Sequence, residues 1–190
     1  LSRMNEIKTE FISMVSHELI TPLTSVKGFL TVVLNRDPGP LTQQQESFLS
    51  IANGSVDRLM LLIEDLLDIS RIEAGKLKIQ SAPTALHELL PQAQRDHSQS
   101  AARRKIALEV DAPPAPSVMA DGHRIRQVID NLITNAMKFT QEGGNIVLSV
   151  REHGDEVVLS VRDTGVGIAP EECGKIFEKF YQINRPLPKS

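Results

Sequence analysis

Apolar residues in the first 80 positions recur at intervals of three and four, which is the spacing of one face of an α-helix. The pattern predicts one helix from about Met4 to Asn35 and another from about Thr42 to Gly75. Between them, Asp37-Pro38-Gly39-Pro40 cannot continue a helix and predicts a turn. Thr42 fits the N-cap of the second helix, with Gln45 three residues on as its partner. We therefore expect an antiparallel helical hairpin.

A near-heptad stripe on each helix predicts the surface between the two helices. The stripes are Ile7, Phe11, Met14, Pro22, Val26, Phe29 and Val33 on the first helix, and Phe48, Ala52, Ser55, Leu59, Leu62, Leu66 and Ile69 on the second. Further apolar residues lie beside the stripes, such as Leu30, Ile51, Ile63 and Leu67. Because two helices cover only one stripe each, these residues predict a homodimer that forms a four-helix bundle.

Beyond residue 80 the pattern changes to short alternating strands interleaved with helices, which is typical of an α/β or α+β domain. We therefore expect two domains, residues 1–80 and residues 81–190. The expected elements are a strand leading in at Leu77 to Ser81, helices at Ala85 to Ala102 and Asp121 to Lys138, strands at Ile106 to Val110 and near Val118, a hairpin of Ile146 to Arg151 and Val157 to Asp163, and a short helix after Pro170.

Composition excludes several classes of protein. Of the 190 residues, 41% are hydrophobic and 24% are charged, which fits one or two folded domains. The net charge of -3 lacks the strongly basic footprint of a nucleic-acid-binding protein. A single cysteine, Cys173, excludes an internal disulfide and favours a reducing, cytoplasmic setting. No apolar run approaches the roughly 20 residues that span a bilayer, so this chain is not expected in a membrane, whereas a longer parent anchored in the inner membrane stays an alternative.

The first helix carries a candidate nucleophile. At 100° per residue, His17 falls about 140° from the centre of the predicted apolar stripe, so we expect it to be exposed. Glu18 is next to it, and Thr21 lies one turn further on, on almost the same face. An exposed imidazole beside a carboxylate can perform nucleophilic or acid–base chemistry, although most surface histidines do neither. Pro22 predicts a bend here, because proline removes a backbone hydrogen bond.

Polar side chains accompany the apolar face of the helix expected at Asp121 to Lys138. That face is expected to consist of Ile125, Val128, Ile129, Leu132 and Ala136. Asn131, Asn135 and Lys138 then line up along one edge of it. An amide oxygen suits Mg²⁺ and a lysine is a point charge for phosphate, so the group fits a metal–phosphate ligand. The alternative is an ordinary amphipathic helix with polar flanks.

The strand that ends at Asp163 leads into a glycine turn. Side chains alternate along a strand, so Asp163 is expected on the covered side with Val157, Leu159 and Val161. Gly165 and Gly167 follow, and glycines let the backbone turn sharply and a ligand approach closely. A buried carboxylate there could accept a hydrogen bond from an exocyclic amine such as that of adenine. A plain turn is the alternative.

Four segments in this order resemble the conserved boxes of sensor histidine kinases. Phe11 to Leu23 (FISMVSHELITPL) resembles the phosphoacceptor box, Asn131 to Thr140 (NLITNAMKFT) the N box, Asp163 to Ile168 (DTGVGI) the first glycine box, and Ile176 to Tyr181 (IFEKFY) the phenylalanine box. Each box is weak alone, but their joint occurrence is specific and covers the whole chain. The resemblance implies a dimerisation and phosphotransfer hairpin, followed by an ATP-binding α/β sandwich of the type shared with gyrase and Hsp90.

The resemblance also implies a role for each candidate residue. His17 is the nucleophile that takes the γ-phosphoryl group of ATP, Glu18 the proton acceptor, and Thr21 a positioner of water in the reverse phosphatase reaction. Asn135 is a ligand of Mg²⁺ with Asn131 nearby, Lys138 meets phosphate, and Asp163 with Gly165 and Gly167 seats adenine. The implied partner is the receiver domain of a response regulator, which accepts the phosphoryl group on an aspartate.

Three departures from the pattern of the family stand out. Ile20 takes the place where relatives usually carry Arg, and Gln182 stands where many have Arg after the aromatic pair. A second glycine box is missing before Ser190, which predicts an incomplete nucleotide site, weak ATP binding and little or no autophosphorylation by the chain alone. These departures keep a rival interpretation open: a non-catalytic dimeric scaffold related to the kinases.

Overall fold

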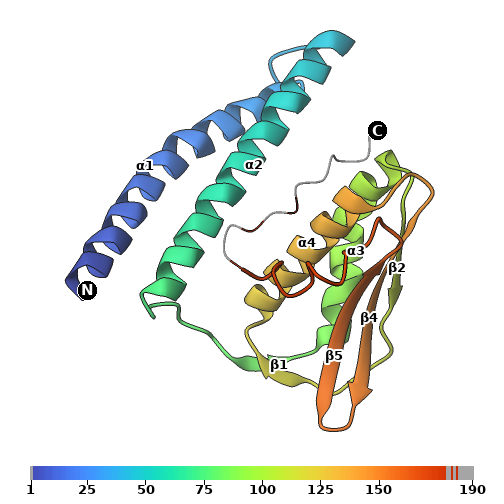
Figure 1. Ribbon diagram of the computed structural model, residues 1–190. Coiled ribbons are helices and arrows are strands. Elements are labelled where there is room, and N and C mark those ends of the chain that lie inside the picture. Colours follow the sequence, from blue (N-terminus) through green and yellow to red (C-terminus); the bar gives the residue numbers. More distant parts are fainter. Residues whose placement is uncertain (1, 179–180, 182, 184–190) are drawn as a thin grey trace. The chain divides into compact units, whose positions relative to one another are not determined.

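The computed structural model describes residues 2–178, 181 and 183, and side chains from residue 7 onward. The chain divides into two compact units, residues 1–78 and 79–190 (Figure 1). The first is a helical hairpin and the second combines two helices with strands, so the predicted fold class is confirmed. Within the described residues, no helix combines the length and the apolar character needed to cross a membrane.

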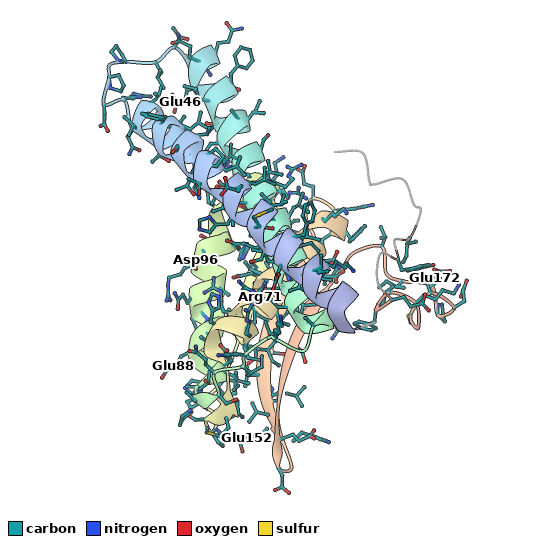
Figure 2. The ribbon with its side chains drawn as sticks, turned by 90° about the vertical axis from the view of Figure 1, so that its left-hand side faces the viewer. Glu46, Arg71, Glu88, Asp96, Glu152 and Glu172 are labelled. Carbon is teal, nitrogen blue, oxygen red and sulfur yellow. The ribbon has the colours of Figure 1, made fainter. Side chains whose placement is uncertain are left out.

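Two long helices, α1 (Ser2–Leu34) and α2 (Gln43–Glu73), make the hairpin. The predicted cap of α2 is confirmed: the Gln45 N–H donates to the Thr42 hydroxyl at 3.2 Å, and the Thr42 N–H donates to the Gln45 side chain at 2.9 Å. Exposed ion pairs join the two helices along their length, from Lys8–Glu73 at the open end through Lys27–Asp57 to Arg36–Glu46 at the turn, where Glu46 is labelled in Figure 2. The hairpin is thus held by local capping and by cross-helix contacts.

The predicted seam inside the hairpin is wrong. Most of its residues are exposed, among them Phe29 at 74% and Leu62 at 59%. The covered side of each helix is the neighbouring stripe, which contains Ser16 at 2% exposure and Ile63 at 6%. Helical spacing shows that a helix has a broad apolar band, but it does not show which part of that band meets the partner helix. The stripes predicted as the seam therefore form a second, exposed apolar face.

Pro22 lies inside α1, which continues without a break from Ser2 to Leu34. Two threonine hydroxyls beside it donate to backbone carbonyl oxygens four residues back, Thr21 to His17 at 3.1 Å and Thr24 to Ile20 at 2.8 Å. Proline removes the N–H that would bond the carbonyl of residue 18, and these two side chains add hydrogen bonds on either side of that gap.

The second unit contains a three-stranded sheet in the order β2-β4-β5, made of β2 (Ala107–Asp111), β4 (Asn145–His153) and β5 (Glu156–Asp163). The central strand β4 pairs in parallel with β2 and antiparallel with β5. Helices α3 (Leu86–Arg103) and α4 (Gly122–Phe139) lie side by side over one face of this sheet (Figure 1). The result is a two-layer sandwich of helices on a sheet, as predicted.

A separate two-stranded sheet joins β1 (Ala82–Thr84) to β3 (Val118–Ala120) in antiparallel register. The strand predicted at Leu77 to Ser81 is therefore wrong, because the chain begins to pair only at Ala82. The short helix predicted after Pro170 is also wrong, since residues 170–177 form a run of turns. Of the predicted phenylalanine box, residues 179 and 180 lie outside the described residues, as does Gln182.

The core of the second unit lies between the helices and the sheet. Ile146, Leu148 and Val150 of β4 alternate along the strand and are fully buried. Ile129 and Ile133 of α4 are also fully buried against this layer. Two residues predicted for the same face of α4 are exposed instead, Val128 and Leu132. The helix is thus rotated from the predicted orientation: Ile133 and Met137 occupy the covered face, and Val128 and Leu132 do not.

Candidate functional site

His17 lies in the middle of α1 with its side chain exposed, as its place on the helix predicts. Ser16, one residue earlier, is buried within the hairpin, and one residue turns the helix by about 100°. His17 consequently points away from α2 as well as away from the exposed apolar stripe. Glu18 and Thr21 are also exposed, so an imidazole, a carboxylate and a hydroxyl stand together on an open surface. Ile20, by contrast, is half-buried.

The polar residues of α4 point away from the core. Asn131, Asn135 and Lys138 are all exposed, and they lie on the side of the helix opposite the buried Ile129 and Ile133. They therefore occupy the outer face, and not an edge of the covered face as predicted. The Lys138 ammonium lies 5.1 Å from the centre of the Phe139 ring. Amide oxygens and an ammonium group are therefore exposed on one face of the helix, where a ligand from solvent can reach them.

Asp163 is on the predicted face of the sheet but is not buried. It pairs across the strands with Ile146, which is fully buried, so the two side chains leave the sheet on the same side. Asp163 itself is exposed, because it ends β5 and the following residues include Gly165 and Gly167, which have no side chains to cover it. Within the described residues its Oδ1 accepts a hydrogen bond from the Gly165 N–H at 2.8 Å, which leaves Oδ2 available to a ligand.

The glycine turn is tied to the end of α4. The Val166 N–H donates to the carbonyl oxygen of Phe139 at 3.4 Å. At the start of β4 the Asn145 N–H donates to the Thr164 hydroxyl at 2.9 Å, and the Thr164 N–H donates to the Asn145 carbonyl oxygen at 3.1 Å. These contacts bring Asp163 and the last turn of α4 together, although they are more than 20 positions apart in the sequence.

Gly165 and Gly167 are required for different reasons. A Cβ at Gly165 would lie 2.7 Å from both the Asp163 carboxylate and the Phe139 carbonyl oxygen, so any side chain would push the turn off the helix. Gly167 has a φ of +67°, in the left-handed region that other residues rarely adopt. The two glycines thus let the backbone pass close to α4 and then reverse direction.

Sequence reasoning missed the residues that hold α4. Asp121 caps the helix through the Arg124 N–H at 3.2 Å and also accepts the Gln80 N–H at 2.9 Å. These backbone hydrogen bonds, that from Gln80 above all, lower the pKa of the Asp121 carboxyl below its ordinary value. Asp121 was readable as a cap from its position before the helix. Its bond to Gln80 was not, because that contact joins segments distant in the sequence.

A charged network also connects α4 to α3. Arg126 bonds Asp130 on its own helix and Asp96 on α3, and His97 of α3 lies 2.9 Å from Asp130. Partial burial acts to lower the pKa of Arg126, but the hydrogen bonds to Asp96 and Asp130 outweigh it and the net shift is upward. The spacing of Arg126 and Asp130 predicts an ion pair along one helix, whereas the contribution of α3 needs the tertiary structure.

Two known domain families match the chain. Residues 7–75 match the family described as "His Kinase A (phospho-acceptor) domain". Residues 120–188 match the family described as "Histidine kinase-, DNA gyrase B-, and HSP90-like ATPase". The first match contains His17, Glu18 and Thr21, and the second contains α4 and the glycine turn. This chain belongs to the histidine kinases.

Curated histidine kinases match it along nearly its whole length. The circadian input-output histidine kinase CikA of Synechococcus elongatus is 39% identical over 186 residues, which are 96% of this chain and 25% of CikA. The aerobic respiration control sensor protein ArcB of Escherichia coli is 34% identical over 185 residues, 96% of this chain and 23% of ArcB. The chain thus spans about a quarter of the length of these histidine kinases.

Solved structures share the fold. The crystal structure of full-length ShkA in complex with AMPPNP aligns with a TM-score of 0.71 and 33% identity, over 91% of this chain and 37% of ShkA. The complex of the histidine kinase ThkA with the response regulator protein TrrA aligns with a TM-score of 0.59 over 91% of this chain and 50% of that one, at 24% identity. The second likeness concerns the fold alone.

Proposed function

We propose that this chain is the catalytic core of a histidine kinase, in which a ring nitrogen of His17 attacks the γ-phosphorus of ATP and ADP leaves. Glu18 accepts the proton that the imidazole loses. The phosphoryl group then passes from His17 to an aspartate of a response regulator. The observation that carries this proposal is the exposure of His17 beside Glu18, clear of both apolar stripes, in a chain that also contains the ATPase fold.

The residues of the second unit fit a nucleotide. Asp163 offers its free Oδ2 to the exocyclic amine of adenine, and the turn at Gly165 and Gly167 leaves room for the ring. Asn135 offers an amide oxygen to Mg²⁺ with Asn131 nearby, and Lys138 meets the phosphates. Bound Mg²⁺ would neutralise charge that develops on the phosphates during transfer. The proposal is supported by ShkA, a relative whose structure holds AMPPNP.

No cluster of three or more His, Cys, Asp or Glu side chains that could hold a metal ion occurs among the described residues. The donors that we assign to Mg²⁺ on α4 are amides, which bind it weakly without help. Phosphate oxygens of ATP have to complete the coordination, and this is consistent with a metal that arrives with its nucleotide.

We propose that the hairpin is also the dimerisation domain. The exposed apolar face of α1 and α2 is too large for a hairpin alone in water, since it includes three Phe and several Leu side chains at 44% exposure or more. A second copy covers it in a four-helix bundle, which leaves His17 on the outside. Residues 1–80 then form the dimerisation and phosphotransfer domain, and residues 81–190 the ATP-binding domain.

Labelling with γ-labelled ATP and Mg²⁺ tests the kinase reaction. We expect an acid-labile, base-stable phosphoryl label, because a phosphoryl–nitrogen bond is hydrolysed in acid. His17→Gln should abolish it, whereas His153→Gln, which alters an exposed histidine at the end of β4, should retain it. The label is followed over hours. Binding of ATP without any label on His17 would favour the non-catalytic scaffold.

A further inference from the structure

The exposed side chains of α4 depend on the helix for their direction. Within the described part of the chain, neither Asn131 nor Asn135 makes a side-chain hydrogen bond to another residue. In the part of the chain that the structure describes, the Lys138 ammonium interacts only with the ring of the adjacent Phe139. No neighbouring group therefore aims these residues at a ligand. Their positions follow from the rotation of α4 about its axis and from its shift along the sheet.

Apolar packing places one face of α4 on the sheet but leaves room for small rotations of the helix. Ile129, Ile133 and Met137 bury the covered face of α4, but dispersion and burial are not directional. Hydrogen bonds are directional, and they weaken steeply when the geometry changes. Residues that bond the flank of α4 to a neighbouring element therefore restrict its orientation further.

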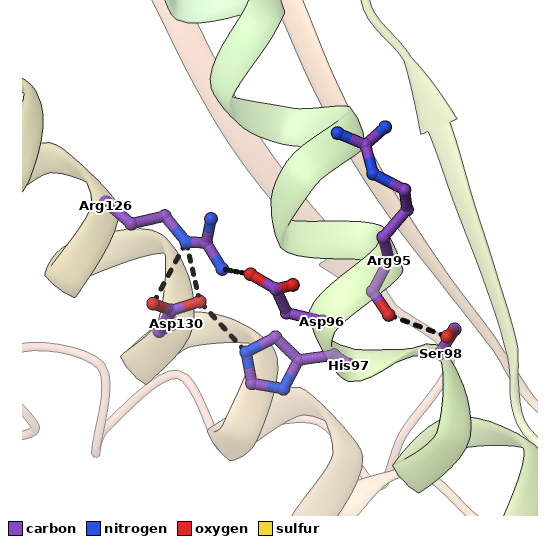
Figure 3. A network of polar contacts seen from close by, with 6 residues as sticks. All are labelled: Arg95, Asp96, His97, Ser98, Arg126 and Asp130. Carbon is purple, nitrogen blue, oxygen red and sulfur yellow. Dashed lines mark hydrogen bonds and ion pairs between the residues drawn. The ribbon is translucent and has the colours of Figure 1, made fainter.

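One such group of bonds joins α4 to α3 (Figure 3). Asp130 accepts from the Nε of Arg126 with both oxygens at 3.0 Å, and it lies 2.9 Å from the Nε2 of His97. Arg126 donates a further bond to Asp96 at 2.7 Å. The side chains of Arg126 and His97 are only 18% and 19% exposed, so solvent screens these contacts less than it screens a surface ion pair.

A further contact lies near the other end of α4. The guanidinium of Arg104, the C-cap residue that follows α3, donates to the carbonyl oxygen of Met137 at 2.8 Å. The bonds at Arg126, Asp130 and Met137 are spread over three turns, which restrains both the rotation and the axial shift of α4. Asp130 is the residue immediately before Asn131, so the central bond acts next to the first of the exposed amides.

We propose that His97 and Arg126 are positioning residues for the nucleotide site: through Asp130 they hold α4 in the orientation that presents Asn131, Asn135 and Lys138 to ATP and Mg²⁺. Neither residue touches the ligand. The proposal rests on the proposed function, because it assigns these exposed residues to a nucleotide. It adds two residues that no resemblance had placed in the site.

The chemistry of the contact between His97 and Asp130 determines which substitution of His97 preserves this contact. An ionised Asp130 carboxylate only accepts hydrogen bonds, so the Nε2 of His97 must carry a hydrogen and donate. Gln places an amide N–H at about the distance of the histidine Nε2 from the backbone, and it keeps the donor. Ala removes the donor and leaves the Asp130 charge with Arg126 alone.

The test is an NMR titration of the whole 190-residue chain with AMPPNP and Mg²⁺, which follows the side-chain amide signals of Asn131 and Asn135. His97→Ala should move both signals in the free protein and should weaken AMPPNP binding by about fivefold or more, which is a typical energetic coupling between distant groups. His97→Gln should bring the affinity back to within about twofold of the original protein, as expected when the donor is retained. Arg151→Gln, which breaks the exposed pair with Asp111 on the sheet, is the matched control and should change neither.

Two results would overturn the proposal: unchanged affinity in His97→Ala, or a loss in His97→Gln equal to that in His97→Ala. Thermal unfolding of the same variants shows whether a loss of affinity merely follows a loss of stability. In that case His97→Gln or Arg151→Gln, where its Tm is as low as that of His97→Ala, would bind AMPPNP as weakly as His97→Ala does. Failure of the original protein to bind AMPPNP would count against the proposed function instead. The amide signals of the free protein would still report whether His97 orients α4.

Discussion

The hydroxyl of Thr21 donates a hydrogen bond to the backbone carbonyl oxygen of His17 at 3.1 Å. The bond uses the hydroxyl hydrogen and leaves the oxygen lone pairs facing solvent on the same surface as the imidazole. A water molecule that approaches His17 from solvent can therefore donate to Thr21. This geometry agrees with a role for Thr21 in orienting water and not in the attack of His17 on ATP.

Thr21→Val should separate the two reactions. Removal of the hydroxyl should leave labelling of His17 within about twofold, but it should slow hydrolysis of the phosphorylated regulator about tenfold or more, because water loses its orientation. Both rates are measured with the response regulator that accepts label from His17. Thr21→Ser retains the hydroxyl and should keep both reactions. Equal loss of both in Thr21→Val would show that Thr21 acts on His17 itself.

Substitutions on the exposed apolar face should dissociate the dimer. Leu62→Glu with Leu66→Glu removes two apolar side chains from each copy and places charges in the bundle. At about 1.5–3 kcal/mol for each buried Leu, the dissociation constant should rise more than about a hundredfold. Analytical ultracentrifugation measures the change. Leu61→Glu is the control, because Leu61 is exposed to 61% and Leu62 to 59% but Leu61 lies off the stripe. A folded monomer of the unaltered chain at micromolar concentration would refute the dimer.

Gly165→Ala should destabilise the second unit. The new methyl group would lie 2.7 Å from the backbone carbonyl oxygen of Phe139, and neither backbone can move without breaking other hydrogen bonds. Overpacking of this kind costs about 1–3 kcal/mol. Urea unfolding of the chain measures the loss, and AMPPNP titration should show weaker binding, since Asp163 would shift with the turn. Gly174→Ala, where a Cβ meets nothing within 4 Å, should leave both values unchanged.

The stability of the second unit should depend on the charge of Asp121. Its pKa is lowered in the folded chain from the ordinary 3.8 by hydrogen bonds from the backbone N–H groups of Gln80 and Arg124. Because the folded pKa is the lower one, the contribution is fully present above pH 3.8 and is lost as the pH falls through the folded value.

Urea midpoints of the original chain and of Asp121→Asn test this dependence. The difference between the two proteins should be constant at neutral pH and should shrink as the pH falls below 3.8. Asn keeps one oxygen for the cap of α4, but its NH₂ group cannot accept the Gln80 N–H, so the loss of that bond adds a part of the difference that does not change with pH. A difference that stays constant down to the lowest pH would mean that Asp121 ionises in the folded chain as it does in the unfolded one.

Local patterns predicted much of the fold. The helical hairpin, the capping box of Thr42 and Gln45, α3, α4 and the β4–β5 hairpin all follow from spacing and from turn residues, because their hydrogen bonds close within a few residues. The exposure of His17 was predicted correctly, although the stripe from which its angle was counted is itself exposed. The strand at β1 was misplaced because its pairing partner, β3, lies more than 30 residues away.

The identity of the chemical groups and the local element that carries each one could therefore be predicted from the amino acids alone. Contacts between distant segments fix which apolar stripe of the hairpin is covered, the exposure of Asp163 at the end of its strand, and the bond between His97 and Asp130 on α4. Periodicity defines the angles within one helix or strand but not the direction in which a neighbour lies. That direction comes from the sum of many contacts between distant segments, and it is what turns a row of polar residues on α4 into a candidate nucleotide site.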